Sequence, residues 1–179
     1  ARDIMAEVYR PLYLNQAPIL FTDRRTAELI KYAANAFLAM KITFINEIAD
    51  LCEVTGTDVQ DVARGIGLDR RIGPKFLNAG PGYGGSCFPK DTLALVQTAQ
   101  ELGAPTRIVE TVVKVNDDRK LAMARTIEAA LGGVQGKTLP VLGLTFTPNT
   151  PHLRDPPPPP PHTHLRKPSA SPPPSPTRA

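Results

Sequence analysis

A run of 30 residues without glycine or proline, from Arg24 to Glu53, constrains the fold of this chain more than any other feature. Such a run predicts one long helix, which spans roughly 40–45 Å at 1.5 Å per residue. Between Leu29 and Cys52 apolar residues occupy nearly every face, so the helix is expected to be buried all round. Charges interrupt this apolar run, which excludes a membrane span. The interrupting residues are Lys31, Lys41, Glu47 and Asp50.

A helix that is apolar all round needs more cover than one small domain supplies. The sequence therefore predicts a homodimer, in which a second copy covers part of the long helix. Cys52 lies near the end of the apolar run and is expected in the core, because a free cysteine usually behaves as a small buried hydrophobe.

Shorter helices are expected around the long one. They cover residues 3–9, which Pro11 ends, then 58–64, 91–102 and about 105–131. No strand pattern interrupts residues 24–131, so this stretch is predicted to be an all-α domain. In its last helix the apolar period predicts a core face, while residues 117–120 are expected to form a solvated turn. That core face comprises Ile108, Val112, Val115, Leu121, Ala124 and Ile127.

The chain changes character after residue 131. Residues 136–146 are predicted to form a strand, although Pro140 removes one donor from its ladder. Residues 151–179 hold 12 of the 20 prolines and are expected to be disordered. They are either the product of a frameshift or a PxxP ligand for an SH3-like partner. The expected organisation is an opening segment (1–23), an all-α central and dimerisation domain with a cysteine loop (24–131), an isolated strand of an α/β domain (132–150) and a proline-rich tail (151–179).

Composition argues against several classes of function. All three histidines follow residue 150, so metal catalysis is not expected in the helical part. Cys52 and Cys87 lie 35 residues apart in dissimilar contexts, which predicts neither a zinc site nor a disulfide. The pI near 9.2 reflects mainly the basic tail, so no nucleic-acid partner is expected. Reduced thiols, with no export signal and no membrane span, favour the cytoplasm.

The most distinctive motif runs from Gly80 to Asp91 and reads GPGYGGSCFPKD. Four glycines within six residues let the backbone adopt positive φ angles and approach a ligand closely. Cys87 follows them directly before a predicted helix. A thiol at that position is commonly a reactive one, so Cys87 is a candidate nucleophile.

Three polar residues are candidates to act with this cysteine. Lys31 and Asn35 share one face of the long helix because they are four residues apart. They can snorkel toward solvent and bond to a loop, or they can present an ammonium and an amide to a ligand oxygen. Asp91 can cap its helix or face the same pocket as Cys87. The residues alone leave these alternatives open.

The cysteine motif, together with AELIKYAAN at residues 27–35, resembles the UDP-glucose 6-dehydrogenases within the nucleotide-sugar dehydrogenase family. The resemblance covers residues 1 to about 155. It implies a two-step, four-electron oxidation of UDP-glucose to UDP-glucuronate with two NAD, through a thiohemiacetal and a thioester on Cys87. It also implies that Lys31 and Asn35 contact the sugar and stabilise oxyanions, and that Asp91 assists proton transfer.

The same resemblance implies further contacts. Arg71 is similar to an arginine that reaches into the neighbouring subunit's site, and Lys90 and Arg154 are similar to residues that contact NAD. Thr147 stands where the family carries a lysine that binds the sugar nucleotide, so that contact is missing. The UDP-sugar pocket is expected to be lined by Phe76, Leu77, Asn78, Ala79, Gly80 and Gly84.

The family's NAD-binding domain is not recognised in this sequence. The resemblance implies that the chain holds the middle domain and the first strand of a truncated C-terminal UDP-binding domain. The chain alone is therefore expected to be inactive. Two alternatives stay open: a GDP-mannose or other nucleotide-sugar dehydrogenase, and a non-catalytic dimerisation remnant.

Overall fold

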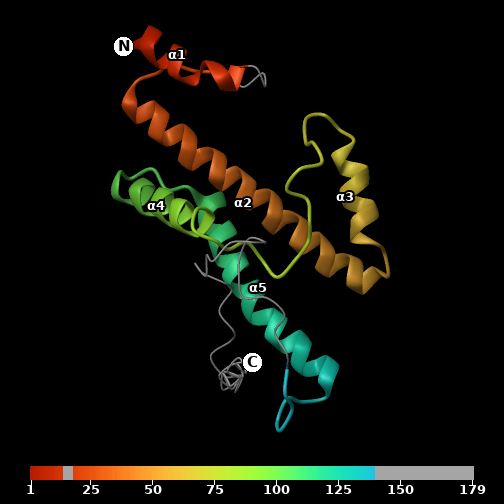
Figure 1. Ribbon diagram of the computed structural model, residues 1–179. Helices are drawn as coiled ribbons and strands as arrows, with labels where there is room; N and C mark the ends of the chain where they lie inside the picture. The colour runs from red at the N-terminus through yellow and green to blue at the C-terminus, as the bar shows by residue number, and fades with distance from the viewer. Residues whose placement is uncertain (14–17, 140–179) are drawn as a thin grey trace, which may run out of the picture.

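A computed structural model describes residues 1–13 and 18–139, which form five helices. In chain order they are α1 (Arg2–Tyr13), α2 (Arg24–Thr55), α3 (Val59–Gly67), α4 (Phe88–Glu101) and α5 (Arg107–Leu131). Figure 1 shows α2 as the long diagonal element, with α4 and α5 on one side of it and α3 beside its C-terminal end. The all-α fold class is thus confirmed for the described residues.

The helix α2 is continuous over 32 residues, or about 48 Å. Asp23 caps its start, since the Asp23 carboxylate accepts a hydrogen bond of 3.0 Å from the Thr26 N–H. Gly56 ends it with a left-handed φ of 70° and donates its N–H to the Cys52 carbonyl. The long helix predicted from the sequence is confirmed.

The other helices assemble on α2. Both α4 and α5 pack against it and against each other, and α3 packs on its C-terminal half. Among the described residues, α1 contacts no other helix. Two small clusters of buried apolar side chains lie at these contacts. One consists of Ala39, Tyr83 and Val112, and the other of Ile45, Ala63 and Leu77.

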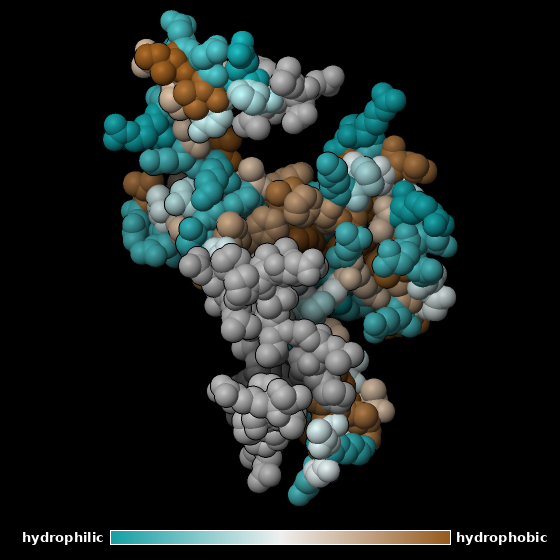
Figure 2. Space-filling model, in the orientation of Figure 1, coloured by the Kyte–Doolittle hydropathy of each residue, from teal (hydrophilic) through white to brown (hydrophobic). Residues whose placement is uncertain are grey.

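Within a single chain α2 is buried on one side only. Burial all round, which the sequence predicts with a second copy as part of the cover, stays a prediction. Too few helices pack on α2 to cover its whole circumference. Four large apolar side chains, seven residues apart, remain exposed, and we call them the apolar stripe of α2: Ile30, Phe37, Phe44 and Leu51. In Figure 2 apolar side chains gather over the middle of α2.

The helix α4 begins three residues earlier than predicted, at Phe88 instead of Asp91. Pro89 lies in the first turn, where its missing N–H would have no helical acceptor. Cys87 is therefore the N-cap residue, and Asp91 lies inside the helix. The expectation that Asp91 caps α4 is wrong.

The helix α1 also differs from its prediction, because it continues through Pro11 to Tyr13. A proline inside a helix leaves the carbonyl four residues earlier, that of Glu7, without a donor. Glu7 is exposed, so water reaches this carbonyl and the break expected at Pro11 does not occur.

The helix α5 buries a different face from the predicted one. Val112 is buried as expected, but Ile108 is 68% exposed and Leu121 is 47% exposed. The buried side continues from Val112 to Asn116 and then to Arg119, whose side chain is only 12% exposed. The prediction of a solvated turn is therefore wrong for Arg119 and for Lys120, whose side chain is 17% exposed.

The remaining expectations concern Cys52, the strand, the tail and a membrane span. Cys52 is 5% exposed, which confirms its place in the core. The strand at 136–146 lies mostly outside the described residues and the tail at 151–179 lies wholly outside them, so both stay predictions. No helix in the described ranges combines the length and the apolarity that crossing a bilayer requires.

Ile45 provides a test of this core. Its side chain has no exposed surface and packs with Ala63 and Leu77. We expect Ile45→Ala to lower the free energy of unfolding by about 2–5 kcal/mol, because it removes buried carbons and leaves a cavity. As a control, Leu68→Ala at an 81% exposed side chain should change it by less than about 0.5 kcal/mol. Urea unfolding measures both, and equally small effects would contradict the assigned core.

Candidate active site

Cys87 lies at the N-terminus of α4, and its carbonyl oxygen accepts a hydrogen bond of 2.9 Å from the Asp91 N–H. This is a helical hydrogen bond, so the two residues lie one turn apart, with about 5–6 Å between their Cβ atoms. The thiol is exposed and lies 3.8 Å from the Ser86 hydroxyl oxygen. The candidate nucleophile is thus accessible, and Asp91 follows it on the same helix.

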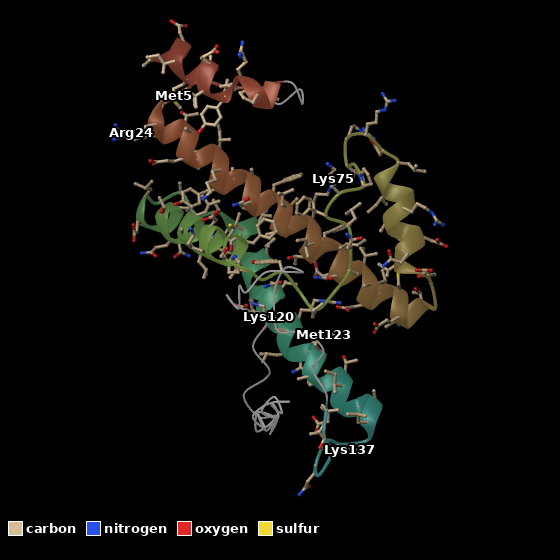
Figure 3. All side chains as sticks on the ribbon, viewed as in Figure 1. Met5, Arg24, Lys75, Lys120, Met123 and Lys137 are labelled. Atoms are coloured by element: carbon tan, nitrogen blue, oxygen red, sulfur yellow. The ribbon has the colours of Figure 1, made fainter. Side chains whose placement is uncertain are left out.

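Asp91 is the centre of the charged groups at this helix start. Its side chain has no solvent exposure, and its Oδ2 accepts a hydrogen bond of 2.6 Å from Asn35 Nδ2. The same oxygen lies 3.3 Å from Lys31 Nζ. Lys90 Nζ lies 3.8 Å from Oδ1, which has no hydrogen-bond partner among the described residues. The contact of α2 and α4, drawn with its side chains in Figure 3, therefore brings four predicted residues together.

These partners decide the charge of the buried carboxylate. Burial by itself raises the pKa of Asp91, but the hydrogen bonds from Asn35 and Lys31 and the charges of Lys31 and Lys90 outweigh it, so the pKa lies below its ordinary value. Asp91 is therefore ionised at neutral pH. The Lys31 and Lys90 side chains are 59% and 69% exposed, which leaves their ammonium groups able to donate further hydrogen bonds.

The stretch 80–86, which precedes Cys87 and which we call the glycine loop, is held by polar side chains from two helices. Asn46 of α2 accepts a hydrogen bond of 2.8 Å from the Gly80 N–H, and Arg119 of α5 donates one of 2.6 Å to the Gly80 carbonyl. Asn116 of α5 pairs twice with Tyr83, accepting from its N–H at 2.7 Å and donating to its carbonyl at 3.2 Å. We call Asn46, Asn116 and Arg119 the loop clamp.

The residues expected to line a sugar pocket take different positions. Leu77 is 3% exposed, so its side chain belongs to the core and only its backbone could face a ligand. Gly84 is buried, Ala79 and Gly80 are partly buried, and Asn78 is exposed. Because the Gly80 N–H and carbonyl are both paired with the clamp, this part of the loop is fixed in place.

Phe76 has a positive φ of 65°, which is uncommon for a residue other than glycine. Its ring lies 6.1 Å from that of Phe88, the residue after the cysteine. Phe88 also makes an edge contact with Tyr83 at 6.2 Å between ring centroids. Phe88, at the start of α4, is therefore packed against both Phe76, which precedes the glycine loop, and Tyr83, which lies within it.

Arg71 is not part of the charged group at the start of α4. It lies on the turn after α3 and forms a fork with Asp69, with distances of 3.0 Å and 2.6 Å from its two donor nitrogens. Its side chain is 89% exposed. Lys41 of α2 ties this turn in place by donating to the carbonyls of Ile72 at 2.8 Å and Gly73 at 3.2 Å. Arg71 is thus presented outward by an anchored turn.

Gly80, Gly82 and Gly85 have the G-x-G-x-x-G spacing of dinucleotide-binding turns. In that motif the glycines follow a strand, whereas here they follow a loop, and the described residues contain no strand. These residues therefore do not fit an NAD site of that kind. Arg154, expected to contact NAD, lies outside the described residues.

Residues 25–118 match the UDP-glucose/GDP-mannose dehydrogenase family, central domain. The match runs from the start of α2 into α5 and covers more than half of the chain. The chain belongs to this family. The resemblance stated from the sequence is thus confirmed.

Related proteins agree with this assignment. The UDP-glucose 6-dehydrogenase of Rhizobium meliloti (strain 1021) is 72% identical over 158 residues, which are 88% of this chain and 36% of that protein. TuaD, the UDP-glucose 6-dehydrogenase of Bacillus subtilis (strain 168), is 50% identical over 88% of this chain and 33% of its own length. A UDP-glucose dehydrogenase structure from Pyrobaculum islandicum matches 86% of this chain and 35% of that one, with 42% identity and a TM-score of 0.79. The present chain therefore spans about a third of the length of the relatives that it matches.

Sequence reasoning missed the loop clamp, although a signal for it exists. Asn116 and Arg119 follow Val112 by four and seven residues, so the helical period places them on the same buried face. Asn46 lies inside the apolar run of α2, where a polar side chain requires a partner. A polar residue at a core position of a helix therefore indicates a buried partner, which here is the backbone of the glycine loop.

Asp91 predicts a specific dependence of stability on pH. Because its pKa is lower in the folded chain than the ordinary value of about 3.9, the ionised carboxylate stabilises the fold above about pH 4, and this contribution is lost as the pH falls through the folded value. We expect Asp91→Asn to lose less stability than the parent between about pH 6 and about pH 3. Urea unfolding at both pH values measures this loss.

The matched control for this prediction is Asp61→Asn, at a carboxylate whose side chain is 64% exposed. It should keep the full pH dependence of the parent, because surface ion pairs contribute little. An Asp91→Asn variant that loses as much stability on acidification as the parent would show that the buried carboxylate is not held as described.

Proposed function

We propose that this chain is the central part of an NAD-dependent UDP-glucose 6-dehydrogenase, which oxidises UDP-glucose to UDP-glucuronate. The observation that carries the proposal is an exposed Cys87 one helical turn before a buried Asp91 that is held by Lys31 and Asn35. The relatives named above, each described as a UDP-glucose dehydrogenase, support the choice of glucose over mannose.

In this proposal Cys87 supplies the covalent step. Its sulfur adds to the aldehyde carbon of the half-oxidised sugar, so that a carbon–sulfur bond forms and the carbonyl π electrons move to oxygen, which takes up a proton to give a thiohemiacetal. Lys31 and Asn35 each have an N–H beyond the one directed at Asp91, and they would donate it to that oxygen.

Asp91 is assigned the proton transfers. It is ionised at neutral pH, it lies one turn from the thiol, and its Oδ1 has no hydrogen-bond partner in the described ranges. We assign to this oxygen the acceptance of the thiol proton during addition. We assign to it also the acceptance of a proton from the water that hydrolyses a thioester at Cys87.

Hydride transfer in such a reaction requires NAD, for which the glycine turn of this chain is not suited. Lys90, exposed beside Asp91, is proposed to contact the cofactor when another part of the protein holds it. The loop from Phe76 to Gly80, with Gly84, is proposed to line the sugar-nucleotide pocket. Its fixed backbone and the unusual φ of Phe76 support this role.

The covalent step can be tested on this chain without NAD. We expect the C6 aldehyde of UDP-glucose to add to Cys87 reversibly, with a gain of the full mass of the aldehyde by native mass spectrometry. A lysine imine would instead lack the mass of one water. Cys87→Ser should abolish the adduct, and Lys31→Ala should weaken it. No adduct on the folded parent chain would refute the catalytic role and leave the non-catalytic pairing module.

We also propose that two copies pair through the apolar stripe of α2. Ile30, Phe37, Phe44 and Leu51 are 46%, 57%, 49% and 57% exposed, and their seven-residue spacing is that of helices that pack along one another. Arg71, displayed outward on its anchored turn, would then reach the site of the second copy.

Charge placed in the stripe tests this pairing. Phe44→Asp is expected to convert a dimer into a monomer in sedimentation at micromolar concentration, because a buried unpaired carboxylate opposes association. The control Leu102→Asp, at a 77% exposed side chain at the end of α4, should leave the dimer intact. A monomeric mass for the parent chain would contradict the proposal.

A further inference from the structure

Arg119 is a largely buried cation whose guanidinium donates hydrogen bonds to three acceptors, on α2 and on the glycine loop. Its Nε donates to the Gly80 carbonyl at 2.6 Å, and its Nη1 donates to the Asn46 carbonyl at 3.0 Å and to Asp50 Oδ1 at 2.6 Å. The Arg119 side chain is 12% exposed, whereas that of Asp50 is 63% exposed. A guanidinium used in this way joins α5, α2 and the glycine loop at one point.

The second part of the clamp depends on a glycine. Asn116, only 2% exposed, occupies both backbone polar groups of Tyr83. A Cβ at Gly82 would lie 2.7 Å from Asn116 Oδ1, and Gly82 has a φ of +123°. The loop can therefore approach Asn116 this closely only because residue 82 is glycine.

The clamp lies close to the cysteine along the chain. Only Gly84, Gly85 and Ser86 separate the fixed Tyr83 from Cys87. On the other side of the cysteine, the Phe88 ring packs against Tyr83 at 6.2 Å. Cys87 is thus confined between two points that are both anchored to the clamp.

We propose that Arg119 and Asn116, together with Asn46, are positioning residues that hold Cys87 in its reactive place at the start of α4. This inference rests on the function proposed above. None of the three is assigned a contact with substrate. They act through the backbone of the loop, so α5, which carries none of the residues assigned to the chemistry, determines where the sulfur lies.

A spin label on Cys87 reports this positioning directly. Cys87 is exposed and Cys52 is buried, so a thiol-specific nitroxide reacts with Cys87 in the folded chain. We expect a restricted spectrum in the parent chain. Arg119→Gln removes the guanidinium that joins α5, α2 and the glycine loop, and Gly82→Ala forces Asn116 away from Tyr83. Both should therefore give a predominantly mobile spectrum.

Each variant has a control, either on the same element or at another glycine with a positive φ. Arg125→Gln replaces an exposed arginine of α5. Gly103→Ala introduces a side chain at a φ of +71° with no atom within 4 Å. Both controls should retain the restricted spectrum. A mobile spectrum in the controls, or a restricted one in both clamp variants, would overturn the proposal.

Hydrogen exchange on the unmodified chain provides a test that needs no variant. If the clamp holds the loop, the amides of Gly80 and Tyr83 must exchange about as slowly as buried amides of α2 and α5. Rapid exchange at these two amides would overturn the proposal even if every variant failed to fold.

The aldehyde reaction separates this inference from the proposed function. In the clamp variants we expect addition to Cys87 to slow by about tenfold or more, because a displaced nucleophile loses its alignment with the carbonyl. If the parent chain forms no adduct but the label and exchange results are as expected, the proposed function fails and the clamp stands. If the parent reacts and the clamp variants react equally fast, the positioning role fails and the function stands.

Discussion

The rest of the site depends on the pairing of the buried Asp91 carboxylate with Asn35 and Lys31. A carboxylate with no exposed surface is strongly unfavourable unless it is paired and hydrogen-bonded. Here Asn35 and Lys31 satisfy one oxygen from α2, while the carboxylate belongs to α4. The contact between the two helices is therefore specified by charge as well as by shape, and the same contact fixes the neighbours of the cysteine.

The glycine loop that leads to the cysteine is held in place by side chains of the neighbouring helices α2 and α5. Its glycines supply conformational freedom but no side chains with which to hold one shape. Buried backbone groups need partners, and those of Gly80 and Tyr83 find them in side chains of α2 and α5. The flexibility that lets the backbone approach a ligand is thus combined with rigidity that the helices provide.

The sequence predicted well what depends on local pattern, and it failed where burial depends on which elements meet. The absence of glycine and proline identified α2, and spacing with resemblance grouped Lys31, Asn35 and Asp91. Arg119 was assigned to a solvated turn, because three of its neighbours are charged and nothing local shows that α2 and the loop converge on it. The start of α4 was misplaced for a similar reason, since Asp91 is a good cap by composition whereas its carboxylate is needed by α2.

The geometry of α2 explains how one helix carries both the charged site and the apolar stripe. Lys31 follows Ile30 directly, and Asn35 precedes Phe37 by two residues, so residues of the charged site alternate with residues of the apolar stripe along the helix. Adjacent residues in a helix point about 100° apart, which separates the two faces without separating them along the axis. A partner that covers the stripe would therefore leave the side of α2 that faces Asp91 of α4 free for the chemistry.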